Sequence, residues 1–125
     1  PLPWYVEALS LIRDRVGPWP AFVVSNGSRS DMRQLLEMAD VTYVRSRSPV
    51  SDLWSLTNCR VLIGSVGSGF TSWPSFFGQM PTVMYPLVEA HSYPIRNRLG
   101  LFNGLLEPDE PDPQLLESLD RMRRG

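Results

Sequence analysis

The apolar positions of residues 2–16 recur at helical spacing. Tyr5, Leu9, Ile12 and Val16 fall on one stripe, which predicts an amphipathic helix. Spacing and start signals predict further helices in four places: from Ser28, from Ser51 with Leu53, Trp54 and Leu56 turned inward, from Thr71 or Ser72 to Gly78, and from Pro113 to the end.

Short apolar runs between these helices predict strands. The runs are residues 21–24, 41–44, 60–64 and 81–85, and the continuous run 21–24 predicts a strand buried on both faces. Residues 87–112 show no such periodicity and are expected to be irregular. Strands that alternate with helices predict a parallel sheet covered by helices.

We therefore expect an α/β fold, a Rossmann-like three-layer αβα sandwich with a four-stranded parallel sheet in the order 2-1-3-4. Residues 1–107 would form a nucleotide-sugar-binding type of domain. Residues 108–125 would add an acidic, proline-rich linker and a C-terminal helix that packs on the same domain. A ligand would bind beyond the carboxyl ends of the strands, where the first and third strands separate.

The composition of the chain excludes several classes of function. With 125 residues the chain is long enough for one domain, and a net charge of −1 gives no attraction to nucleic acid or anionic lipid. No apolar run is long enough for a membrane span, and no leader pattern opens the chain, so a cytoplasmic protein is expected. All twelve basic residues are arginine, which excludes a P-loop lysine and Schiff-base chemistry.

The sequence contains few of the residues that usually bind metal ions. Cys59 is the single cysteine and His91 the single histidine, which exclude a disulfide framework and argue against zinc. We expect no metal and no cofactor. His91 follows the fourth predicted strand, in a polar loop, where a solvated side chain is the simpler interpretation than a catalytic one.

The strongest local signal is a glycine-serine turn that follows the third predicted strand and opens a helix. Its candidate donor-binding and phosphate-binding residues are Ser65, Gly67, Ser68, Gly69, Phe70 and Thr71. Glycine permits close backbone approach, and a helix N-terminus offers free N–H groups to an anion. The same residues are also compatible with a plain tight turn and a helix cap, so pattern alone leaves both interpretations open.

Residues 51–86 (SDLWSLTNCRVLIGSVGSGFTSWPSFFGQMPTVMYP) resemble the donor-binding region of fucosyltransferase-type glycosyltransferases of the GT-B fold. Those enzymes have an acidic helix, then a strand-turn-helix of the form lI-x-S-x-S-S/T-F-S/T-x-W, then a P-x-v strand. The matching positions, in order, are Asp52, Ile63, Ser65, Ser68, Phe70, Thr71, Trp73 and Pro81. Upstream, WYVEAL is similar to the family's YY-x-x-A-I/L helix, and FVVSNGS to its f-v-f-S-D-D strand and turn.

The resemblance implies a nucleotide-sugar partner, a GDP-sugar first, with its diphosphate on the serine-rich turn. It also implies base or ribose contacts from Ser25, Asn26 and Asp52. The family's S-D-D turn stands here as Ser25-Asn26-Gly27. The family's arginine motif precedes its YY helix, upstream of Pro1 of this chain, so we expect no sugar transfer by these residues alone, and the catalytic residues are unknown.

Two interpretations of function follow. In the first, the chain is a fragment or a shortened relative of a glycosyltransferase donor-binding domain. In the second, it is a non-catalytic binding or oligomerisation module. Bare sheet edges lead us to expect either a two-fold dimer or packing against a missing N-terminal half.

Overall fold

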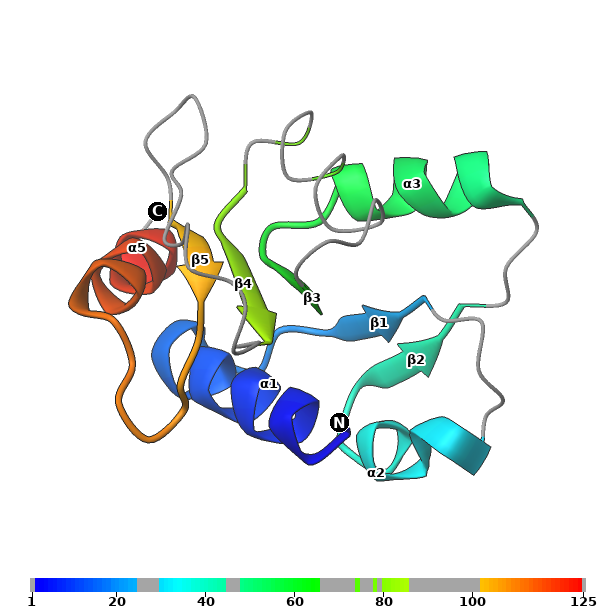
Figure 1. Ribbon diagram of the computed structural model, residues 1–125, viewed down its shortest axis with the longest axis horizontal. Helices are drawn as coiled ribbons and strands as arrows, with labels where there is room; N and C mark the ends of the chain where they lie inside the picture. Colours follow the sequence, from blue (N-terminus) through cyan, green and yellow to red (C-terminus); the bar gives the residue numbers. More distant parts are fainter. Residues whose placement is uncertain are drawn as a thin grey trace.

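The computed structural model describes residues 2–24, 30–44, 48–65, 74, 78, 80–85 and 102–124. Helices and parallel strands alternate along these residues as far as residue 65 (Figure 1). In chain order the elements are α1 (Leu2–Val16), β1 (Ala21–Val23), the 3₁₀ turn η1 (Ser30–Met32), α2 (Arg33–Leu36), β2 (Val41–Tyr43), α3 (Pro49–Thr57), β3 (Leu62–Ser65), β4 (Thr82–Tyr85), β5 (Asn103–Leu105) and α5 (Pro113–Arg124).

The strands form two separate sheets rather than one. Among the described residues β1 pairs with β2 alone, and the second sheet has the order β3-β4-β5. Every pair is parallel, as expected, but β1 and β3 share no ladder among the described residues. The predicted Rossmann-like sandwich with a single four-stranded sheet in the order 2-1-3-4 is therefore wrong.

The missing ladder has a physical reason in the strands themselves. Figure 1 shows β1 and β2 running across the view while β3 and β4 run downward, whereas neighbouring strands of a sheet diverge by only about 20–25°. The backbone groups of Ala21 and Val23 are directed at β2, so those of Pro20 and Phe22 point away from β2. Pro20 has no N–H group to donate to a ladder.

Because the two sheets are separate, the side chains of β1 are partly exposed. Phe22 at the centre of the strand is 38% exposed, and Ala21 and Val23 are only half-buried. The prediction that residues 21–24 are buried on both faces is therefore wrong. A continuous apolar run is buried on both faces only when a second strand and a helix layer close around it.

The second sheet contains a strand that the sequence did not predict. β5 lies within residues 87–112, which were expected to be irregular, and it pairs in parallel with β4. Its Asn103-Gly104 dipeptide is a common turn signal. Pairing with the buried strand β4 overrides that local preference, because Thr82 donates its N–H to Phe102 O (2.8 Å) and Leu106 donates its own to Met84 O (3.0 Å).

The hydrophobic core joins the two ends of the chain. It contains Ala8 and Ile12 of α1, Val83 of β4, and Leu115 and Leu119 of α5, all nearly or fully buried. In Figure 1, α1 and α5 lie side by side next to β4 and β5, in agreement with their contacts. The predicted amphipathic helix 2–16 and the predicted helix from Pro113 are confirmed.

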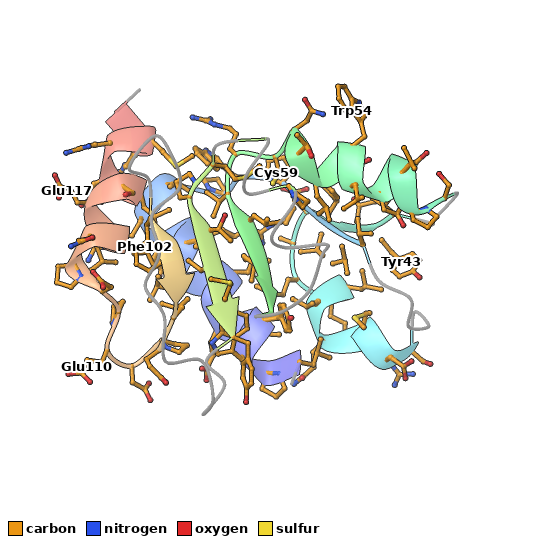
Figure 2. All side chains as sticks on the ribbon, turned by 45° about the horizontal axis from the view of Figure 1, so that its top comes forward. Tyr43, Trp54, Cys59, Phe102, Glu110 and Glu117 are labelled. Carbon is orange, nitrogen blue, oxygen red and sulfur yellow. The ribbon has the colours of Figure 1, made fainter. Side chains whose placement is uncertain are left out.

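Helix α3 presents a different face from the one predicted. Trp54 is 70% exposed and Val50 76% exposed, whereas Asp52 is buried. Figure 2 shows Trp54 pointing away from the body of the molecule. The inward face follows the spacing of Asp52, Leu53 and Leu56, and Trp54 lies outside that stripe, so its predicted inward orientation is wrong.

Candidate functional site

The candidate site begins at Ser65, the last residue of β3. Ser65 is in register with Tyr85, the last residue of β4, so these two parallel strands end side by side. Ligands of open parallel sheets bind beyond the carboxyl ends of the strands. The chain leaves β3 at Ser65 directly into the glycine-serine sequence, and the position of that sequence after a parallel strand is as expected.

Asp52 occupies the first turn of α3, and its side chain is only 5% exposed. It is the one ionisable side chain that is buried among the residues the structure describes. The N-terminus of a helix stabilises a carboxylate through the free N–H groups and the helix dipole. Asp52 donates its own backbone N–H to Ser48 O (3.1 Å), which fixes the start of the helix around it.

The cap of α3 is Ser48 rather than the predicted Ser51. Ser48 has extended backbone angles, and its Oγ accepts the N–H of Ser51 at 3.1 Å. Pro49 stands at the first helical position, where its missing N–H is not needed. This capping determines where α3 begins, and the packing of the helix then buries Asp52 while its neighbour Ser51 stays exposed.

The other predicted site residues lie outside the described residues. These are Ser25 and Asn26 after β1, and Gly67, Ser68, Gly69, Phe70 and Thr71 after β3. Of the helix predicted from Thr71 or Ser72 to Gly78, only Pro74 and Gly78 are described. Of the predicted site, the structure therefore describes Ser65 at the carboxyl end of β3 and the buried Asp52.

A cavity of about 380 Å³ separates the two sheets. Its walls come from Leu9 and Ile12 of α1, from Ala21 and Phe22 of β1, and from Ile63 of β3, with the end of α3 closing it further. Sequence reasoning missed this cavity, because its existence depends on the failure of β1 and β3 to pair. The apolar runs of the two strands were its only signal.

A second cavity lies next to the end of α3. A cavity of about 330 Å³ lies between Met80, Pro81 and the α5 residues Arg121 and Met122, and Arg60 lines both cavities. Cys59, labelled in Figure 2 at the junction of α3 and β3, also lines both.

The thiol of Cys59 is held in its neutral form. Burial raises the pKa of Cys59 from 9.0 to about 11, and its Sγ lies 3.0 Å from Leu56 O, to which it donates a hydrogen bond. A thiol with this pKa is a poor nucleophile at neutral pH. The Cys59 side chain nevertheless keeps partial exposure.

The described part of the chain offers neither a cluster of metal ligands nor a helix suited to a membrane. Within it, no group of three or more His, Cys, Asp or Glu side chains could hold a metal ion. No helix found there is both long enough and apolar enough to cross a membrane.

The sequence did not predict a functional role for Arg13 and Arg60, whose guanidinium groups lie beside the larger cavity. Arg60 places its guanidinium carbon 4.0 Å from the centre of the Trp19 ring, and Arg13 Nε donates to Trp19 O at 3.1 Å. The signal that could have pointed to Arg60 is its position just before the apolar run that forms β3.

Comparison with known proteins adds no family to this description. No protein-family model matches the sequence, and the searches of curated proteins and of solved structures found no match.

Proposed function

We propose that the chain binds the diphosphate of a nucleotide sugar, a GDP-sugar first, at the turn that follows β3. The observation that carries the proposal is the ending of β3 and β4 side by side at Ser65 and Tyr85. A glycine-rich turn that leaves a parallel sheet at this edge offers backbone N–H groups where anions bind in such folds. The resemblance of residues 51–86 to fucosyltransferase donor sites supports the choice of ligand.

In this proposal Ser68, Phe70 and Thr71 contact the donor, and Ser65 supports the turn. Asp52 is the proposed contact to the ribose or base, because a buried carboxylate is an acceptor for hydroxyl and amino groups. We propose binding without sugar transfer. Binding energy alone does not raise the rate, because catalysis requires groups that stabilise the transition state more than the substrate.

Titration of the protein with GDP, GDP-fucose and UDP, followed by amide chemical shifts, tests this proposal. We expect shifts at residues 65–72 at millimolar ligand. Ser68→Ala should weaken GDP binding about tenfold, as expected for one hydrogen bond to a charged group. Ser10→Ala, at an exposed position on α1, is the control and should bind GDP like the wild type. Absence of shifts at residues 65–72 would refute the proposal.

The exposed pair Val50 and Trp54 favours the second candidate, an oligomerisation module. These side chains are one helical turn apart on α3, and paired exposed apolar residues are a common feature of contact surfaces. Sedimentation velocity on the same samples separates the candidates. A monomer that binds GDP supports the first, and a dimer that is weakened by Trp54→Gln and ignores GDP supports the second.

A further inference from the structure

The cavity between the two sheets is partly open and is lined mainly by hydrocarbon. Leu9 and Ile12 of α1 lie on one wall, and Phe22 of β1 and Ile63 of β3 on others. Its volume of about 380 Å³ falls in the range of small-molecule sites, and exceeds the roughly 150 Å³ that accommodates benzene.

One end of this cavity is positively charged. Trp19 contacts both guanidinium groups there: Arg60 lies over its ring at 4.0 Å, and Arg13 donates to its carbonyl oxygen at 3.1 Å. Arg13 also donates to Asp40 O at 3.3 Å, so its hydrogen bonds go to backbone carbonyls. Across the described residues, the ion pairs join Arg15 to Asp120 and Arg121 to Glu117, and neither involves Arg13 or Arg60.

Position separates this cavity from the proposed nucleotide site. Trp19 precedes β1 and Arg60 precedes β3, so the charged end lies at the amino ends of these strands. Ser65 stands at the opposite end of β3. The two sites therefore depend on different residues, and binding at one does not require the other.

We propose that the cavity between β1 and β3 binds a small apolar carboxylate, with its hydrocarbon body between the sheets and its carboxylate on Arg60 and Arg13. The apolar walls favour an aliphatic or aromatic body over a sugar or a nucleotide, because polar groups buried there would lose their hydrogen bonds to water. The planar guanidinium fork of arginine matches a carboxylate with two parallel hydrogen bonds. A neutral ligand of equal size would gain only the apolar contacts.

Octanoate and octan-1-ol form a matched pair of probes, because they share one hydrocarbon chain and differ in the charged end. Their binding is followed by the methyl resonances of Ile12, Leu62 and Ile63, with amide shifts of residues 65–72 recorded in the same spectra. We expect octanoate to shift the three methyl groups and to bind at least about tenfold more tightly than octan-1-ol.

Two variants test the two halves of the proposed contact. Arg60→Gln should reduce the preference for octanoate over octan-1-ol to less than about threefold, because the remaining Arg13 is already engaged with backbone carbonyls. Ala21→Leu adds side-chain volume at the cavity wall and should weaken both probes. Arg123→Gln, at an exposed position on α5 away from both cavities, is the charge-matched control and should change nothing.

Circular dichroism checks that each variant is folded before its binding is compared. Equal affinity for octanoate and octan-1-ol would overturn the proposal, as would a preference for octanoate that survives Arg60→Gln. Octanoate shifts that miss the three methyl groups, or an absence of shifts at millimolar probe, would overturn it as well. A loss of octanoate binding in Arg60→Gln that leaves GDP binding intact would support it and confirm that the sites are separate.

Discussion

At the scale of single residues, burial decides what each reactive group can do. Asp52 and Cys59 lie on the same short helix and its end, yet their environments differ. Asp52 is buried in the first turn of α3. Cys59 follows the last turn, where burial disfavours the thiolate and a carbonyl oxygen accepts its S–H.

Cys59 should therefore be alkylated slowly at pH 8. A pKa of about 11 in place of 9.0 lowers the thiolate fraction at that pH about a hundredfold, and the thiolate is the reacting form. Intact-mass analysis of iodoacetamide labelling from pH 7 to 11 measures this, with the urea-unfolded chain as reference. Labelling of the folded protein at the unfolded rate at pH 8 would contradict the prediction.

The same shift has a consequence for stability. Because the folded pKa lies above the unfolded value, the folded state holds its proton more tightly, and the free energy of unfolding falls as pH rises from about 9 to about 11. Below pH 9 this group leaves stability unchanged with pH. Cys59→Ala removes this contribution, so the variant should lose less stability than the wild type across that interval in urea titrations.

At the scale of elements, short segments depend on their ends. β1, β2 and β5 have three residues each, and α2 has four, so none of them is stable without its neighbours. α3 is longer and carries a proper cap at Ser48, followed by Pro49 at its first position. Its start is thus determined locally, while the face that it buries is determined by packing.

Ser48→Ala should destabilise the protein by about 1 kcal/mol, because it removes the acceptor for the N–H of Ser51. Ser51→Ala is the matched control: it keeps that backbone N–H and loses only an exposed hydroxyl contact, so we expect less than about 0.5 kcal/mol. Urea unfolding midpoints of both variants measure the difference. A larger loss in Ser51→Ala than in Ser48→Ala would show that the cap is elsewhere.

At the scale of the whole molecule, the first and last helices close one core. Trp4 Nε1 in α1 donates to Leu106 O at 2.9 Å, across a separation of 102 residues. Trp4 also packs edge-to-face against Tyr85 of β4. α5 adds Leu115 and Leu119, both fully buried, to the same cluster. The core therefore forms only when both ends of the chain are in place.

Leu119→Ala should cost about 2–5 kcal/mol of unfolding free energy, because it leaves a cavity in a fully buried cluster. The next residue provides a comparison: Asp120→Asn breaks the pair with Arg15 at 3.3 Å, whose side chains are each 42% exposed. Water screens such a pair, so we expect less than about 1 kcal/mol. Equal losses in the two variants, measured by thermal and urea unfolding, would contradict the assignment of the core to this face of α5.

Local pattern was sufficient for several elements of this protein. The apolar stripe of residues 2–16 and the run from Pro113 predicted α1 and α5, since a helix with one apolar face must bury it. The runs near residues 41–44, 60–64 and 81–85 predicted β2, β3 and β4 to within two residues. The placement of Ser65 at the end of a parallel strand followed from the same reading.

Tertiary structure decided what depends on partners distant in sequence. β5 exists because β4 offers it hydrogen bonds, against the turn preference of Asn103-Gly104. Trp54 faces solvent and Asp52 the interior because packing selects one face of α3. The separation of the two sheets, and with it the cavity beside Trp19 and Arg60, depends on the relative direction of β1 and β3. Periodicity reports which side of an element is apolar, but the angle between two strands is set by everything that packs against them.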